Sequence, residues 1–444
     1  MSAIPENGLS RKLGLFPVTN IVIANMIGAG IFTTSGLLMR DLNSPMLMIL
    51  LWIAGGIIAL CGALCYGELG AAIPRAGGEY VFLTELFHPV TGFLSGWVSF
   101  FVGFTAPIAA SAIGFSEYFT RAFPHLLAWG DPASLKKLYA VVIIAAFTFI
   151  HLRGIAFGSK VQNYLTLLKV LLIAGLVVAG FSSGRGDFNH LFQGAEFNLN
   201  YEGWKTIGLS LIWIMFAYSG WNASAYIGSE IKNPVKNLPY SLLLGTGCVI
   251  FLYLCLNVLY IYAITPENMK GVIPIGALAA ENLFGSSLEN IFSALISFAL
   301  FSSLSAFIIL GPRVYYSMAK DGYFFKFAAK VHPVFRVPSK SILLQCTIAI
   351  VVVLSGSFDQ ILTYMGFSLG IFPILAVIGV IKLRLTKKST FKMPGFPVVP
   401  LFYLLASCTI LVLSFLERQI ESSIAIVTVL TGIPVYFIFK KTKQ

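Results

Sequence analysis

Charged residues are scarce in this chain. Only 11% of the 444 residues are Asp, Glu, Lys or Arg, whereas 57% are hydrophobic. Several apolar runs of about 20 residues follow one another, which is typical of a polytopic membrane protein. We therefore expect one integral membrane domain rather than several soluble ones. The net charge of +12 does not indicate nucleic-acid binding, because the basic residues fall mainly between the apolar runs.

Cysteine and histidine are too few and too dispersed to form a metal site. No second Cys pair and no His cluster accompanies the pair Cys61 and Cys65. The six cysteines all lie inside apolar runs, and we interpret them as buried small hydrophobic residues: Cys61, Cys65, Cys248, Cys255, Cys346 and Cys408. We expect no metal and no cofactor.

Signals for secretion and for catalysis are also missing. The polar head 1–11 and the lack of small residues after the first apolar run argue against a cleavable signal peptide. No nucleophile–base pair is evident. The sequence Gly28-Ala29-Gly30 lacks the strand, the third glycine and the lysine of a nucleotide-binding loop. We therefore expect no enzyme and assign no catalytic residue.

Twelve apolar segments are predicted to cross the membrane as helices, which makes the chain an all-α polytopic membrane protein. They cover roughly 14–39, 45–69, 90–119, 138–153, 160–182, 204–229, 239–264, 288–318, 340–357, 360–383, 397–416 and 421–439. An even number places both termini on one side. That side carries about 20 of the basic residues and the other about 8, so we expect both termini in the cytoplasm and the protein in the cell (inner) membrane.

The first span is interrupted by glycine. Gly28 and Gly30 lie in its middle, and each costs about 1 kcal/mol of helix propensity. A break at that depth exposes backbone groups that lipid cannot satisfy, so it must line a protein cavity or hold a ligand. The alternative interpretation is a close contact between helices through small residues.

The sixth span has a matching irregularity, with Ser219-Gly220 and Asn222 near its centre. Spans 1 and 6 are corresponding members of two five-span halves, 14–182 and 204–383, which are followed by two more helices over 397–439. An odd number of spans gives the halves opposite topology. Paired interruptions in inverted repeats indicate the binding site of a transporter.

Two facing breaks are suited to an α-amino acid. A new helix N-terminus offers free N–H groups to a carboxylate, and a new C-terminus offers carbonyls to an ammonium group. Neither Asp nor Glu occurs in the central part of span 1 or 6. Recognition by the backbone therefore fits this chain better than ion pairing.

These stretches resemble known motifs. Ile27-Gly28-Ala29-Gly30-Ile31-Phe32 and Phe216-Ala217-Tyr218-Ser219-Gly220-Trp221-Asn222 are similar to the span 1 and span 6 motifs of the amino acid–polyamine–organocation (APC) transporters, and most of all to the L-type amino acid transporter branch. Gly67-Glu68-Leu69, Pro74–Tyr80, Glu230–Pro234 and Asn237-Leu238-Pro239 extend the resemblance. It implies the leucine-transporter fold, with two inverted five-helix repeats and two extra helices.

The resemblance also implies which residues bind substrate. The N–H groups of Ala29 and Gly30 would take the carboxylate, and carbonyls at the breaks would take the amine. Phe216 would close over the substrate as the outer gate, although it is otherwise an ordinary packing aromatic. The expected substrate-binding residues are Met26, Ile27, Ala29, Gly30, Phe216, Ala217, Ser219 and Asn222.

Lys169 stands inside an apolar span, where a charge is costly and usually functional. Snorkelling to the membrane surface is the alternative, but Lys169 lies about two turns beyond Lys160. In some relatives, a lysine here replaces the sodium ion of sodium-driven members. The resemblance therefore implies contacts with Gly28 and with Ser302 or Ser303. Burial disfavours the charged form, so we expect proton loss to couple to opening.

We therefore predict a secondary active transporter that moves α-amino acids by alternating access, without sodium, either by exchange or coupled to protons. The alternative is a polyamine or cationic amino acid carrier, which needs an acidic residue that we cannot place in the pocket. Relatives that carry a disulfide-linked heavy subunit use a cysteine after span 3, and Thr120–Lys137 contains none. We expect Arg313 to pair with a cytoplasmic acid or a lipid phosphate, and we leave Glu117 outside the site. The remaining partners are the amino acid and the lipid bilayer.

Overall fold

The computed structural model describes residues 11–194, 198–355, 358–386 and 391–443, and helices make up most of them. The α-helices are α1 (Leu15–Met26), α2 (Ala29–Leu42), α3 (Pro45–Ala72), α4 (Glu79–Leu86), α5 (Pro89–Val98), α6 (Thr105–Ala122), α7 (Pro132–Leu152), α8 (Ile155–Ser182), α9 (Tyr201–Ala217), α10 (Pro234–Ala263), α11 (Pro266–Met269), α12 (Ile275–Phe284), α13 (Ser286–Lys320), α14 (Ser339–Ser355), α15 (Phe358–Leu385), α16 (Val398–Glu417) and α17 (Gln419–Lys443). Short 3₁₀ turns are η2 (Pro124–Trp129), η3 (Phe188–Phe192), η4 (Ala223–Tyr226), η5 (Gly228–Glu230) and η6 (Lys326–Ala329), and η1 (Ser99–Gly103) is a π-helix.

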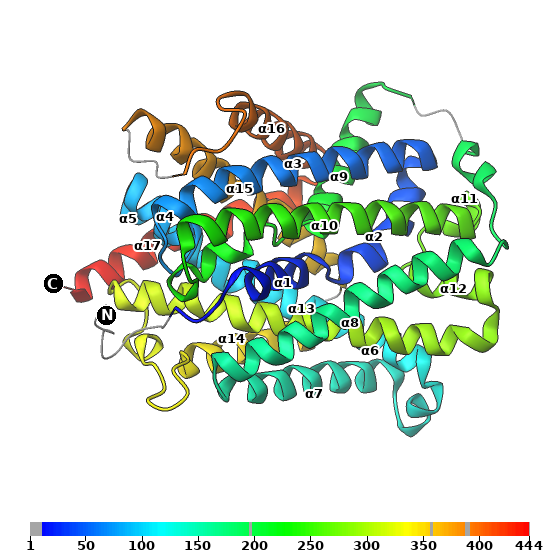
Figure 1. The fold of residues 1–444 in the computed structure, drawn as a ribbon, viewed down its shortest axis with the longest axis horizontal. Coiled ribbons are helices and arrows are strands. Elements are labelled where there is room, and N and C mark those ends of the chain that lie inside the picture. The colour runs from blue at the N-terminus through cyan, green and yellow to red at the C-terminus, as the bar shows by residue number, and fades with distance from the viewer. Residues whose placement is uncertain (1–10, 195–197, 356–357, 387–390, 444) are drawn as a thin grey trace.

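The long helices run along one axis and form a bundle (Figure 1). Ten helical segments of the described chain are long and apolar enough to cross a membrane. Helix α14 is a shorter apolar helix at the predicted position of span 9, and α9 occupies the first half of the predicted span 6. This confirms the predicted all-α polytopic architecture. Helix α1 begins and α17 ends at the same end of the bundle, here called the terminal end, as an even number of crossings requires (Figure 1).

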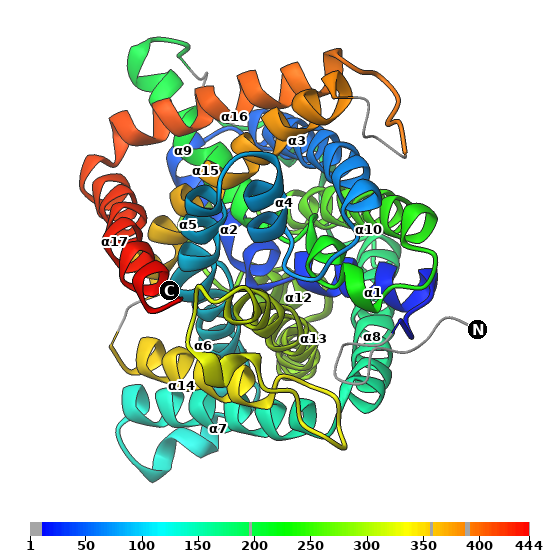
Figure 2. The same ribbon diagram turned by 90° about the vertical axis from the view of Figure 1, so that its left-hand side faces the viewer.

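The bundle has an inner and an outer set of helices. Viewed from the terminal end, α7, α8, α14, α16 and α17 lie on the outside (Figure 2). The most apolar part of α17 is only 22% buried, whereas the corresponding parts of α5–α6 and α13 are 83% and 78% buried. Outer helices therefore present apolar side chains to lipid. Cys408 on α16 is exposed for this reason, and Cys61, Cys248 and Cys255 are half-buried. The expectation that all six cysteines are buried therefore holds only for Cys65 and Cys346.

The two interrupted spans lie inside the bundle. Span 1 is divided into α1 and α2 in its middle, as predicted (Figure 1). Span 6 differs from the prediction of a helix that resumes after its break, because only the first half, α9, is α-helical. Beyond Ala217 the chain continues in turns, η4 and η5. Gly220 has a φ of +95°, which is outside helical geometry and suits glycine.

Two local features were not expected from the sequence. The turn after span 2 leads into the additional helix α4 instead of passing directly to span 3. Span 3 contains the π-helix η1, in which the Phe104 N–H donates to the Ser99 carbonyl at 3.1 Å. Pro107 follows and has no N–H to offer the Gly103 carbonyl, which explains why regular winding fails here. The short helix α12 lies between α10 and α13 in the chain.

Candidate functional site between the broken helices

The break in span 1 creates a helix N-terminus inside the protein. Ile27 and Gly28 leave helical geometry, with ψ values of 84° and −158°, and α2 starts at Ala29. Gly28 has no side chain that could cap the helix. In the described part of the chain, no acceptor is bonded to the N–H groups of Ala29 and Gly30. These donors, together with the positive end of the α2 dipole, suit an anion.

The two breaks lie in direct backbone contact. A Cβ atom on Gly30 would lie 2.7 Å from the Ala217 Cα, so the end of α9 fits only against a glycine. On the other side, a Cβ on Gly220 would lie 2.9 Å from the Asn25 carbonyl carbon. Glycine thus permits a close approach that any side chain would prevent. This arrangement confirms the prediction that both helices lose their winding opposite each other.

Tyr253 on α10 joins the two breaks. Its hydroxyl lies 2.7 Å from the Met26 carbonyl and 2.9 Å from the Ala217 carbonyl, and it is fully buried. These carbonyls end α1 and α9, where no continuing helix supplies the N–H donor that they would otherwise have four residues further on. One phenol therefore holds together the C-terminal ends of both interrupted helices.

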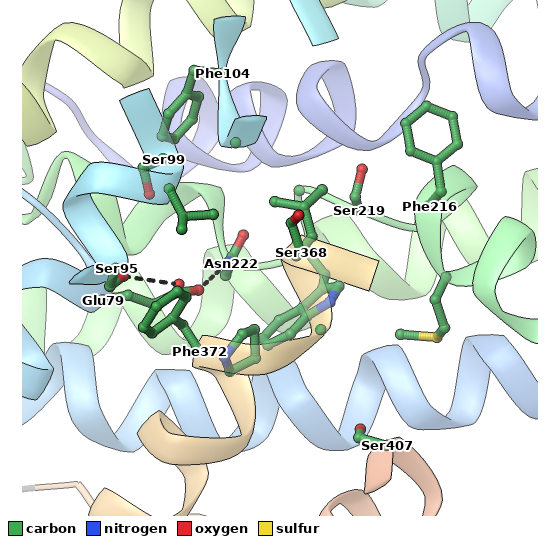
Figure 3. A pocket seen from close by; sticks show the side chains of 18 of the residues that line it. Glu79, Ser95, Ser99, Phe104, Phe216, Ser219, Asn222, Ser368, Phe372 and Ser407 are labelled. Carbon is green, nitrogen blue, oxygen red and sulfur yellow. Dashed lines mark hydrogen bonds between the residues drawn. The ribbon is translucent and has the colours of Figure 1, made fainter. Parts of the chain in front are cut away.

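Two neighbouring cavities, which share several lining residues, adjoin the breaks. The smaller one lies between them and is lined by Asn25, Met26, Gly28, Ala29, Gly30, Pro107, Ala110, Ser111, Phe216, Ala217, Ser219 and Phe307. The larger has an empty volume of about 1000 Å³, including space open to solvent. Asn25, Phe216, Ser219 and Phe307 line both cavities. Glu79 and Asn222 lie toward one end of the larger cavity and Phe216 at the other (Figure 3).

The structure distributes the predicted substrate-binding residues over two places. Ala29, Gly30, Ala217 and Ser219 line the smaller cavity together with Met26 and Phe216, whereas Asn222 lines only the larger one. The Met26 carbonyl already accepts from the Gly28 N–H and from Tyr253.

Ile27 lines neither cavity, so the structure does not place it with the other predicted substrate-binding residues. The break turns its carbonyl toward α8 and α13, where it accepts from Lys169 and Ser303.

Lys169 is fully buried and reaches the break from α8. Its ammonium donates to the Ala24 carbonyl at 3.4 Å, to the Ser303 hydroxyl at 2.8 Å and to the Ile27 carbonyl. The prediction that Lys169 contacts the broken part of span 1 and span 8 is therefore confirmed.

Of the two serines predicted for this contact, only Ser303 bonds to Lys169, and Ser302 has other partners. It bonds with the Gln162 amide at 3.0 Å and with the Thr166 hydroxyl at 3.1 Å. Adjacent residues of a helix point about 100° apart, so only one of the two serines can face the lysine.

Two other charged residues behave as expected. Arg313 on α13 forms a buried ion pair with Glu230, with its Nε atom 2.9 Å from the carboxylate. Glu117 pairs with Lys136 at 2.7 Å on an exposed surface. Neither Arg313 nor Glu117 lines the cavities.

Sequence reasoning missed Asn25, Tyr253 and Glu79. Asn25 lines both cavities, and its Oδ1 atom is buried without a hydrogen-bond partner. It directly precedes the break, which was an available signal. Tyr253 gave no local signal, because it lies in an ordinary apolar span. Glu79 is part of the Pro74–Tyr80 motif, but its distance from Asn222 depends on the tertiary fold.

Glu79 starts α4, between the membrane-spanning helices α3 and α5, and it lines the larger cavity. Burial raises the pKa of its carboxyl group above the ordinary range, and hydrogen bonds from Tyr66, Tyr226, Asn222 and Ser95 oppose part of that rise.

A sequence profile described as amino acid permease matches residues 13–438. The chain is 29% identical to the serine/threonine exchanger SteT of Bacillus subtilis over 447 residues, which cover 99% of each protein. It is 27% identical to the large neutral amino acids transporter small subunit 2 of Mus musculus over 97% of this chain and 81% of that protein. It is 26% identical to the b(0,+)-type amino acid transporter 1 of Mus musculus over 98% of this chain and 89% of that protein.

Proposed function

The chain belongs to the amino acid permease family, and we propose that it exchanges α-amino acids across the cell membrane by alternating access. Its relatives include L-type amino acid transporters and an exchanger, in line with the motif resemblance. The observation that carries the proposal is the N-terminus of α2, whose unbonded N–H groups at Ala29 and Gly30 face a cavity that Asn25 and Ser219 also line.

In this proposal the substrate lies between the breaks. Its carboxylate accepts from the Ala29 and Gly30 N–H groups, where the α2 dipole also favours negative charge. Its ammonium group donates to the unpartnered Asn25 Oδ1 and to carbonyls at the ends of α1 and α9. A buried acceptor without a partner is costly, so occupation by a donor stabilises the complex. Phe216, which borders both cavities, closes over the bound amino acid.

Lys169 supports transport that does not need sodium. Sodium ions bind oxygen ligands, and the oxygens of Ala24, Ile27 and Ser303 already surround the lysine ammonium. We propose that this ammonium holds the end of α1 against α13. Loosening of these bonds lets α1 tilt during alternating access, in a pair of inverted repeats over 14–182 and 204–383. A change in the charge of Lys169 would couple this step to protons.

We further propose that the terminal end of the bundle faces the cytoplasm and that the protein works without a heavy subunit. The excess of basic residues at that side supports the orientation. The segment Thr120–Lys137, which follows span 3, offers no cysteine for a linkage. Relatives named for large neutral amino acids and for serine and threonine do not favour the polyamine or cationic carrier.

Counterflow in proteoliposomes tests the function. Vesicles loaded with unlabelled serine or leucine are expected to take up the same labelled amino acid faster than empty vesicles, equally in sodium and in choline buffer. A thermal-shift screen of the purified protein against the twenty amino acids identifies the ligands that bind the folded state. Absence of both a shift and counterflow for every amino acid would refute the proposal.

A further inference from the structure

Glu79 is a buried acid in the larger cavity with only neutral partners. Its Oε1 atom accepts from the Tyr66 hydroxyl at 2.7 Å and from the Asn222 amide nitrogen at 2.8 Å. The Ser95 hydroxyl lies 3.5 Å from Oε2. The carboxylate is 6% exposed, and the donors come from α3, α5 and the turn after α9. Such a set of donors suits an ionised carboxylate.

Nearby bases do not neutralise this charge. In the described part of the chain, no Lys, Arg or His lies within 4 Å of Glu79. Arg75, which precedes α4, pairs with Glu85 and Asp321, and Arg384 on the adjacent α15 pairs with Glu68. Lys382 of α15 donates to the Leu86 carbonyl. The titratable groups that face Glu79 are the phenols of Tyr66, Tyr226 and Tyr403.

The bond to Glu79 decides how the Asn222 amide is oriented. A carboxylate only accepts hydrogen bonds, so the amide atom that faces it must be the nitrogen. The same nitrogen lies 3.3 Å from the Tyr226 hydroxyl. The Asn222 oxygen is consequently turned away from Glu79 toward the cavity (Figure 3). Asn222 thus presents an acceptor to whatever occupies the pocket.

We propose that Glu79 is a positioning residue that determines substrate class: it holds the Asn222 amide with its oxygen toward the cavity and adds a negative charge to the cavity wall. Together these features accept amino acids with neutral side chains and exclude those with an acidic side chain. A second carboxylate in the pocket would face like charge and an acceptor instead of a donor. This inference rests on the proposed amino acid exchange, with the substrate between the breaks and its side chain directed into the neighbouring larger cavity that Glu79 and Asn222 line.

Competition by aspartate tests the inference. Serine or leucine counterflow is measured with increasing external aspartate for the wild type and for Glu79→Gln. The variant removes the negative charge and lets the Asn222 amide present either its oxygen or its nitrogen to the cavity. The ratio of the half-inhibitory concentration of aspartate to that of unlabelled serine should therefore fall by about tenfold or more. Glu85→Gln, which alters an exposed acid on the same helix, should leave this ratio unchanged. An unchanged ratio in Glu79→Gln refutes the inference.

The role of Asn222 is tested by combining variants. Glu79→Gln should raise the KM for serine more than it lowers kcat, and this effect should disappear in an Asn222→Ala background, because residues that act through one another are not additive. An equal rise in KM in both backgrounds shows that Glu79 does not act through Asn222. If the wild type exchanges no amino acid, the proposed function fails. If it does and the variants leave selectivity unchanged, only this inference fails.

Tyr66→Phe provides a test if Glu79→Gln does not fold. It keeps the carboxylate but removes the donor at 2.7 Å, so the ionised form loses support and protonates at higher pH. Aspartate, whose side chain has an ordinary pKa of about 3.9, stays charged above pH 5.5. The pH below which aspartate begins to compete should therefore be higher in Tyr66→Phe than in the wild type. If aspartate begins to compete at the same pH in both proteins, the inference is contradicted.

Discussion

Gly30 and Ala217 place the backbones of the two broken helices against each other: a Cβ on Gly30 would lie 2.7 Å from the Ala217 Cα and 2.8 Å from its Cβ. The contact is between backbone and backbone, so no rotamer change can relieve a clash. The free N–H groups of α2 and the end of α9 therefore border one cavity. The proposed site depends on this close approach of Gly30 to Ala217.

Gly30→Ala should separate the two breaks. Overpacking of this kind costs about 1–3 kcal/mol, so the melting temperature in detergent should fall and counterflow should be lost. Gly247→Ala on α10 is the matched control, because a Cβ there meets nothing within 4 Å. Alanine favours a helix over glycine, so the control should be as stable as the wild type or more so. Normal transport by Gly30→Ala would show that the contact is not required.

Tyr253→Phe should loosen both breaks at once. The variant retains the ring but removes the hydroxyl that bonds the carbonyls of Met26 and Ala217. The Met26 carbonyl keeps the Gly28 N–H as a donor, but the buried Ala217 carbonyl loses its hydroxyl partner. A buried acceptor without a partner costs about 1–3 kcal/mol, so we expect lower thermal stability and slower exchange. Tyr240→Phe, an exposed tyrosine of the same helix, is the control. Equal melting temperatures for the two variants would contradict the bridging role.

Lys169→Ala should abolish uptake in proteoliposomes while the protein still folds. The ammonium donates to the Ile27 carbonyl at the end of α1 and to the Ser303 hydroxyl of α13, and alanine can replace neither bond. Elution as a single species from a sizing column checks folding, and counterflow checks transport. Lys160→Ala, an exposed lysine of the same helix, should transport normally. Full activity of Lys169→Ala would remove the proposed coupling role.

Glu79 should make stability depend on pH. Burial raises the pKa of Glu79 in the folded protein, so the folded state binds this proton more tightly than the unfolded chain does. The resulting stabilisation is complete below the unfolded pKa of about 4.3 and is lost as pH rises through the folded pKa. The melting temperature of the wild type, measured relative to Glu79→Gln, should therefore fall as the pH rises above about 4.3. A constant difference would show that Glu79 is not perturbed.

The composition of the sequence was enough to predict the spans and their order. Apolar length alone specifies where a chain crosses a bilayer, and each of the twelve predicted segments contains an α-helix of the structure, although span 6 is α-helical only in its first half. Gly28 and Gly30 likewise identified the first break, because glycine is costly in the middle of a helix. Local features of this kind can be recognised without knowledge of which helices pack against the segment in the folded protein.

The contacts across the bundle were decided by the tertiary structure. Ser302 and Ser303 are equivalent in the sequence, and only the rotation of α13 places Ser303 at Lys169. Tyr253 and Glu79 lie far along the chain from the breaks or from Asn222, and their hydrogen bonds depend on packing. The sequence by itself determined where helices form and where they are interrupted. The packed fold decided which side chains meet at those interruptions. The rotation of each helix and its position along the bundle axis follow from many weak contacts, which no short motif encodes.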